Sequence, residues 1–120
     1  MLILVTNDDG IHAPGIRAIA KEMRNLGEVV VSAPFHQKSA ISHSITLYHP
    51  LMATHWREDG MDFHAVEGTP ADAVKLALRE LLTAPPAFVV SGINFGLNTG
   101  SNILYSGTVG GALESAQFGI

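Results

Sequence analysis

The sequence contains no cysteine among its 120 residues, and only 15% of the residues are charged. Without a thiol the chain has no disulfide bond, no thiolate zinc site and no cysteine nucleophile. Lysine and arginine number 7 against 11 acidic residues, which gives a formal net charge of −4. Because this balance provides no broad basic surface, we expect no binding to duplex nucleic acid.

Long apolar runs are also missing from the sequence. No stretch approaches the roughly 20 apolar residues that a transmembrane helix needs. The apolar stretch at residues 2–5 is too short for the core of a secretion signal, and no basic segment precedes it. We therefore expect no membrane partner and a cytoplasmic location.

The chain is rich in apolar residues, at 47%, which is enough for one compact core and too little for two. We expect a single α/β domain over residues 1–120 with a mostly parallel sheet, because apolar strands alternate with amphipathic helices. Buried strands are predicted from residue 2, at 28–33 and at 87–91. Helices are predicted at 14–26, from the Thr69 N-cap to the Pro85-Pro86 pair, and from about residue 108.

Two details of this pattern are specific enough to test. Gly27 is predicted to end the first helix as its left-handed terminal residue. Residues 45–66 are rich in β-branched and aromatic residues, with a turn signal at 57–60, and predict short strands or a hairpin.

The first strand runs directly into Asn7, Asp8, Asp9 and Gly10. Two adjacent carboxylates at the carboxyl end of a buried strand repel each other, and a divalent cation offsets this repulsion. Asn-Asp-Asp-Gly is also common in turns, and aspartate near the start of a helix stabilises the helix dipole. This segment alone leaves metal binding and a capped turn equally open.

Polar loops follow all three predicted buried strands, and such loops meet at the carboxyl edge of a parallel sheet. Apart from one histidine, these loops offer oxygen donors, which favours magnesium or manganese over zinc. The candidates are Asn7, Asp8, Asp9, Ser39, Ser42, His43, Ser44, Ser91, Asn94, Asn98, Ser106 and Thr108.

Ser106, Gly107 and Thr108 stand where the last helix is predicted to begin. Free backbone N–H groups and the helix dipole make such a position suitable for a phosphate. The alternative is that a hydroxyl caps its own helix and that the following glycines allow close packing. For His43, a role in proton transfer or phosphate binding and a role in anchoring its loop both stay open.

Five segments in this order closely resemble the SurE family. They are residues 5–16 (Val-Thr-Asn-Asp-Asp-Gly-Ile-His-Ala-Pro-Gly-Ile), 33–46 (Ala-Pro-Phe-His-Gln-Lys-Ser-Ala-Ile-Ser-His-Ser-Ile-Thr), 68–74 (Gly-Thr-Pro-Ala-Asp-Ala-Val), 91–100 (Ser-Gly-Ile-Asn-Phe-Gly-Leu-Asn-Thr-Gly) and 105–109 (Tyr-Ser-Gly-Thr-Val). The resemblance implies a three-layer, Rossmann-like α/β fold and a hydrolase acting as a metal-dependent phosphatase on nucleoside 5′- and 3′-monophosphates.

The resemblance also implies roles for individual residues. Asp8, Asp9, Ser39 and Asn94 match the family's ligands for one divalent cation per subunit, Mg²⁺ or Mn²⁺. Ser106, Gly107 and Thr108 match its phosphate-contacting turn, and Asn7 belongs to the same first-loop motif. Asp8 and Asp9 are the catalytic candidates, because either carboxylate can accept a proton from the attacking water.

The chain resembles only the N-terminal portion of SurE proteins, which continue with more of the sheet and a C-terminal segment used in homodimer and homotetramer contacts. We therefore expect a domain truncated at its C-terminus. A catalytically weak module that binds metal or nucleotide is one alternative to the phosphatase. A receiver-like signalling domain is another, although no aspartate follows the strand that ends at Ser91 and no lysine occurs beyond Lys75.

Overall fold

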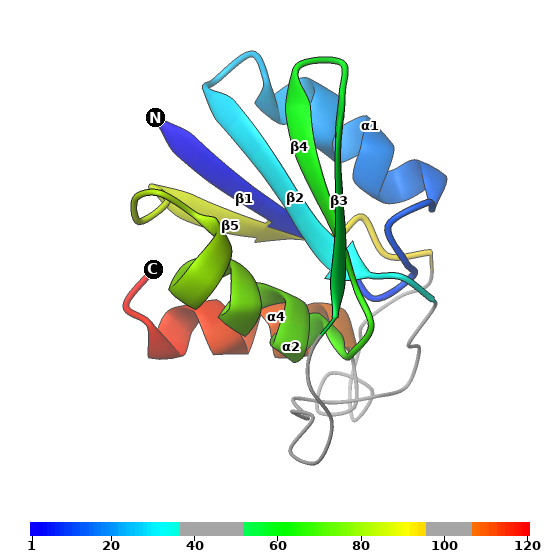
Figure 1. The fold of residues 1–120 in the computed structure, drawn as a ribbon, viewed down its shortest axis with the longest axis vertical. Helices are drawn as coiled ribbons and strands as arrows, with labels where there is room; N and C mark the ends of the chain where they lie inside the picture. Colours follow the sequence, from blue (N-terminus) through cyan, green and yellow to red (C-terminus); the bar gives the residue numbers. More distant parts are fainter. Residues whose placement is uncertain (37–51, 96–106) are drawn as a thin grey trace.

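The computed structural model describes residues 1–36, 52–95 and 107–120, which form one five-stranded sheet with helices on both faces (Figure 1). The strand order is β3-β4-β2-β1-β5. The strands are β1 (Leu2–Thr6), β2 (Glu28–Pro34), β3 (Ala53–Glu58), β4 (Met61–Val66) and β5 (Phe88–Ser91). The helical elements are α1 (Pro14–Met23), α2 (Pro70–Leu76), the π-helical turn η1 (Ala77–Leu81) and α4 (Gly107–Gln117).

Four strands of the sheet are parallel, and only β3 runs in the opposite direction. In β1, Leu4 is paired with Val30 on one side and with Val89 on the other. The parallel strands therefore end at the same edge of the sheet, with β1 between β2 and β5. The mostly parallel α/β fold expected from the sequence is confirmed, and the loop after β1 lies between the ends of two neighbouring strands.

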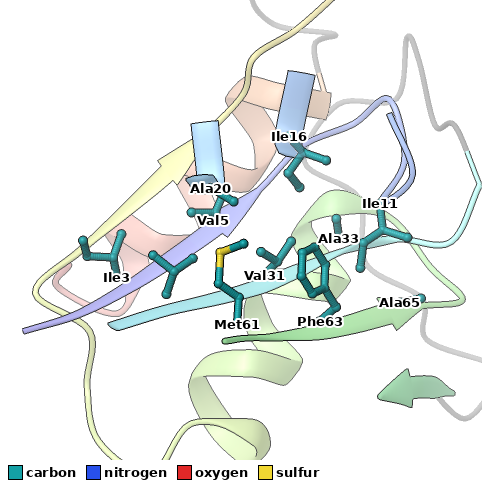
Figure 2. Packing of buried hydrophobic residues seen from close by; sticks show 11 residues of the cluster. Ile3, Val5, Ile11, Ile16, Ala20, Val31, Ala33, Met61, Phe63 and Ala65 are labelled. Carbon is teal, nitrogen blue, oxygen red and sulfur yellow. The ribbon is translucent and has the colours of Figure 1, made fainter. Parts of the chain in front are cut away.

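The side chains of β1 alternate between two hydrophobic clusters, one on each face of the sheet. Figure 2 shows the larger cluster, which joins the sheet to α1. It includes Ile3, Val5, Ile16, Ala20, Val31, Met61 and Phe63. The smaller cluster joins the opposite face to α2 and η1 through Leu4, Val30, Val74 and Ala77. Because both faces are covered, the apolar residues of β1 and β2 are buried as the sequence predicted, except that Leu2 at the start of β1 is half-buried.

The first helix is three residues shorter than predicted, and the predicted role of Gly27 is wrong. The helix ends at Met23, and Leu26 is exposed. Gly27 has no positive φ; instead, a Cβ atom at this position would lie 2.2 Å from the Met1 carbonyl oxygen. The glycine is therefore required by close contact between two backbone segments, which a helix-ending pattern in the sequence does not reveal.

The predicted hairpin is present as β3 and β4 within the described residues, while residues 45–51 lie outside them. The turn is formed by Asp59 and Gly60, which have φ angles of 51° and 75°. Two positive φ angles produce the turn geometry that suits the right-handed twist of a hairpin.

The second helix begins as predicted. The Thr69 side chain accepts a hydrogen bond from the Asp72 backbone N–H at 3.1 Å, and the Asp72 carboxylate accepts one from the Thr69 N–H at 2.9 Å. This reciprocal capping box satisfies two N–H groups that a helix start leaves unpaired. The helical segment ends at Leu81, before the Pro85-Pro86 pair.

The third predicted strand is present as β5, but its four residues are only half-buried. Among the described residues β5 pairs with β1 alone, so one of its edges lacks a neighbouring strand. The predicted last helix is present as α4 and begins at Gly107. No helix in the described part of the chain is both long enough and apolar enough to cross a lipid bilayer.

Candidate metal and phosphate site

The loop after β1 is held in one conformation by backbone and side-chain hydrogen bonds. The Asn7 side-chain amide donates to the Gly10 carbonyl oxygen at 2.8 Å, and Gly10 has a φ of 105°. The Ile11 N–H donates to the Pro34 carbonyl oxygen at 2.8 Å, which ties the loop to the end of β2. The turn that brings both carboxylates to the sheet edge therefore depends on a glycine with a positive φ.

An aromatic stack anchors the other end of this loop. The His12 ring stacks on Trp56 of β3, with centroids 5.6 Å apart and planes inclined by 11°. Trp56 in turn stacks on Phe63 of β4 at 5.5 Å. Trp56, the single tryptophan of the sequence, is thus a packing residue between the first loop and the sheet.

Asp8 is buried, with 4% of its surface exposed, and it points toward the start of α4. The Thr108 hydroxyl donates to Asp8 Oδ1 at 2.6 Å. Thr108 is itself held by β5, because the Ser91 hydroxyl donates to the Thr108 carbonyl oxygen. One chain of hydrogen bonds thus joins the ends of β5 and β1 to the first turn of α4.

Burial raises the pKa of Asp8, and the negative charge of Asp9 raises it further, whereas the hydrogen bond from Thr108 lowers it. Within the described residues, no lysine, arginine or histidine forms an ion pair with Asp8. An ionised carboxylate that is this buried costs free energy unless a positive charge lies beside it. The site is therefore electrostatically suited to a cation.

Asp9 occupies a different environment from its neighbour. It is half-buried, and its Oδ2 accepts a hydrogen bond from the Phe95 backbone N–H at 2.8 Å. This contact brings the segment that contains Asn94 to the first loop, across 86 positions of sequence. The predicted meeting of the first and third loops is thus observed for Asp9 and the segment after β5.

A pocket of about 560 Å³ opens beside Asp9. Its walls are the start of α1 and the segment after β5, through Asp9, Ala13, Pro14, Gly15, Ile93, Asn94 and Phe95. We call it the Asp9 pocket. Its volume lies within the range of small-molecule sites in proteins, about 300–1,000 Å³.

The residues present fit a hard divalent cation. Within the described ranges no three histidine, aspartate or glutamate side chains gather as a metal site, so a cation here would depend on fewer carboxylates and on amide oxygens. The available donors are two carboxylates and an amide, and Mg²⁺ and Mn²⁺ bind such oxygen ligands. A further carbonyl oxygen, Asn7 Oδ1, is buried without a hydrogen-bond partner among the described residues. The chemistry of this donor set agrees with magnesium or manganese and disfavours zinc.

The candidate residues are only partly within the described structure. Asn7, Asp8, Asp9, Ser91, Asn94, Gly107 and Thr108 lie within it, whereas Ser39, Ser42, His43, Ser44, Asn98 and Ser106 fall on residues outside it. The hydroxyl of Thr108 contacts Asp8, a partner that the sequence did not indicate. Its contact with phosphate stays a prediction.

Sequence reasoning also missed Phe95, which contributes both its N–H and an exposed ring beside Asp9. The sequence did contain a signal for Phe95. This large aromatic residue directly follows the candidate ligand Asn94 in a glycine-rich loop, where core packing rarely requires such a ring. The His12 and Trp56 stack had no comparable signal, since it joins two segments through a strand register that the sequence left uncertain.

Comparisons with known proteins give consistent matches. The sequence is 53% identical over 122 residues to the 5′-nucleotidase SurE of Rhodopirellula baltica, covering 100% of this chain and 48% of that protein. It is 57% identical over 116 residues to the 5′-nucleotidase SurE of Moorella thermoacetica, covering 95% of this chain and 45% of that protein. The chain spans about half the length of the curated relatives it matches.

The fold gives the same result. The crystal structure of the SurE protein from Aquifex aeolicus superposes with a TM-score of 0.89 at 42% sequence identity, covering 100% of this chain and 48% of that one. The sequence profile described as survival protein SurE matches residues 3–120. The chain therefore belongs to the SurE family.

Proposed function

We propose that the protein is a metal-dependent phosphomonoesterase that hydrolyses nucleoside 5′-monophosphates, and 3′-monophosphates as well, to nucleoside and phosphate. The observation that carries this proposal is the buried Asp8 carboxylate, which adjoins Asp9 and has no cationic partner in the described structure. The names of the relatives support the nucleotide as substrate.

In this proposal Asp8, Asp9 and Asn94 hold one divalent cation per subunit, Mg²⁺ or Mn²⁺, together with Ser39. A bound cation of this kind polarises a phosphoryl oxygen and lowers the pKa of a coordinated water. Thr108 fixes the orientation of Asp8 through its hydroxyl, and the Phe95 N–H does the same for Asp9. Such outer contacts orient the ligating oxygens.

The first turn of α4 is proposed to bind the phosphate, with Ser106, Gly107 and Thr108 as the contacting segment. The 11-residue helix α4 begins at Gly107, and the first N–H groups of an α-helix point toward its N-terminal end. Such groups stabilise the charge that spreads over the phosphoryl oxygens in the transition state. Asn7 is assigned to the same site through its place in the first loop.

Proton transfer from the attacking water is proposed to use Asp9. Asp9 is half-buried and lines the pocket, whereas Asp8 is almost completely buried. A base must lie within hydrogen-bond reach of the proton that it accepts, either directly or through one water. Direct attack by water requires no covalent intermediate on Asp8, which is already committed to the cation.

The receiver-like alternative disagrees with the architecture. The sheet contains an antiparallel strand, β3, beside β4, whereas doubly wound receiver domains have parallel strands in the order 2-1-3-4-5. A module that binds metal or nucleotide without turnover is the second candidate, because the chain covers about half of each matched relative.

The test is phosphate release from adenosine 5′-monophosphate with Mn²⁺, before and after chelation by EDTA. Asp9→Asn and Asp8→Asn are each expected to reduce turnover by at least about 100-fold, since each removes a charged ligand of a catalytic metal. Asp59→Asn is the matched control, because Asp59 lies at an exposed hairpin turn with a positive φ that asparagine tolerates.

Two outcomes would contradict the proposal. Turnover that persists in EDTA would show that no metal is needed. Mn²⁺ and nucleotide binding without phosphate release would favour the binding module over the enzyme.

A further inference from the structure

The Asp9 pocket is lined by two segments that are fixed against each other. A Cβ atom on Gly15 would lie 2.5 Å from the Ile93 carbonyl oxygen, so the first turn of α1 packs directly on the backbone of the segment after β5. The second fixed point is the hydrogen bond from the Phe95 N–H to Asp9. The pocket is therefore bounded by backbone contacts on two sides.

Two large apolar side chains of the pocket wall are exposed. Ile93 is 54% exposed, and Phe95 is 96% exposed. Within the described residues, the Phe95 ring has no aromatic or cationic ring contact. A phenylalanine this exposed stabilises the fold by almost no burial, so its ring is available to a ligand.

The pocket and the candidate metal site share Asp9. A nucleoside monophosphate carries a charged phosphate at one end and a flat, largely apolar base at the other, joined by a sugar. If the phosphate lies at the carboxylates, the apolar wall beside Asp9 is the adjoining surface that suits the base.

Resting on the function proposed above, we propose that the Asp9 pocket is the base-binding subsite and that the Phe95 ring stacks on the face of the nucleobase. Asp9 and Asn94 are the polar side chains of its lining, and both are assigned to the cation. Within the described lining no side chain is left to hydrogen-bond to a base edge. Stacking on the Phe95 ring recognises the face of the base, so a purine, with its larger face, is expected to bind better than a pyrimidine.

The test compares a substrate that has a base with one that lacks it. For wild type and Phe95→Ala, kcat/KM is measured with adenosine 5′-monophosphate and with ribose 5-phosphate in Mn²⁺. Loss of the stacking contact with the base is expected to lower the ratio of the two values by about 5- to 150-fold. The substitution keeps the backbone N–H that binds Asp9, and Phe95→Trp is expected to restore the ratio.

Leu26→Ala is the matched control. Leu26 is 56% exposed and lies beyond the opposite end of α1, so the substitution removes a similarly exposed apolar side chain away from the pocket. The ratio is expected to stay at the wild-type value in this variant. Circular dichroism of each variant verifies that the fold is retained.

The outcomes separate this inference from the proposed function. If the wild type releases phosphate from neither compound, the enzymatic proposal fails, and calorimetric affinities for the same two compounds in Mn²⁺ test the subsite instead. An unchanged ratio of kcat/KM or of affinities in Phe95→Ala overturns the subsite. A change in oligomeric state of this variant on size-exclusion chromatography also overturns it, because a protein surface would then cover the ring.

Discussion

Replacing Thr108 with valine removes one hydroxyl from the candidate site and keeps the shape of the side chain. In the structure this hydroxyl donates to Asp8 Oδ1 at 2.6 Å, and Asp8 is 4% exposed. The Thr108 backbone remains held by Ser91, whose hydroxyl donates to its carbonyl oxygen. The substitution therefore tests a single hydrogen bond to a buried carboxylate.

Two effects on metal binding follow from the loss of this hydrogen bond. Mn²⁺ affinity is expected to fall by about 10- to 100-fold, the usual cost of removing a group that orients a metal ligand. The hydrogen bond also lowers the pKa of Asp8 against the larger opposing effect of burial, so its loss raises this pKa further. Because the ionised carboxylate binds the metal, the pH dependence of affinity moves to higher pH.

Isothermal titration of Mn²⁺ over a series of pH values measures both effects. Thr108→Ser is the matched control, since serine keeps the hydroxyl, and it is expected to retain most of the affinity. A thermal melt of each variant separates loss of the site from loss of the fold. An Mn²⁺ affinity and pH profile equal to those of the wild type in Thr108→Val would show that the Thr108 to Asp8 contact does not support a metal site.

Three further predictions concern stability, each measured by urea unfolding. Gly15→Ala is expected to lower the free energy of unfolding by about 1–3 kcal/mol, because the added Cβ would clash with the Ile93 carbonyl oxygen. A higher free energy of unfolding in this variant would show that the backbone at Ile93 moves away easily. Thr69→Ala costs about 1 kcal/mol through loss of the N-cap, and an unchanged midpoint would contradict this. Burial, followed by the charge of His55, lowers the pKa of His64 below 6.5, so unfolding takes up a proton and stability falls as pH drops below 6.5. His64→Gln is expected to weaken this pH dependence, and an equal slope in the variant would refute the assignment.

The sequence predicted those parts of the fold that depend on local chemistry. The apolar run of β1 followed by Asn-Asp-Asp-Gly located the first loop, and Thr69-Pro70 located the start of α2, because both signals lie within a few residues. The end of α1 was predicted wrongly, since the close approach of the Met1 backbone, and not the end of a helix, requires a glycine at position 27. Likewise, half-burial of β5 depends on its neighbours in the sheet.

The candidate site shows the same division between residue choice and geometry. Asp8 and Thr108 were both candidate site residues. The hydrogen bond from the Thr108 hydroxyl to the Asp8 carboxylate, however, joins residues that are 100 positions apart in the sequence. No local pattern records a contact of this kind. Motif order indicated which residues belong together, and the packing of α4 against the end of β1 determines which atoms touch.

The two adjacent carboxylates follow one strand but lie in different surroundings, and the proposed hydrolysis requires this difference. Asp8 is fixed by α4 and shielded from water, so its oxygens are suited to hold a cation in place. Asp9 is half-buried and lines the pocket, where substrate and water can reach it. If Asp9 were as buried as Asp8, the site could bind metal but would lack a base accessible to water. The turn at Gly10, which brings both carboxylates to the edge of the sheet, is therefore as necessary to the proposed chemistry as the carboxylates themselves.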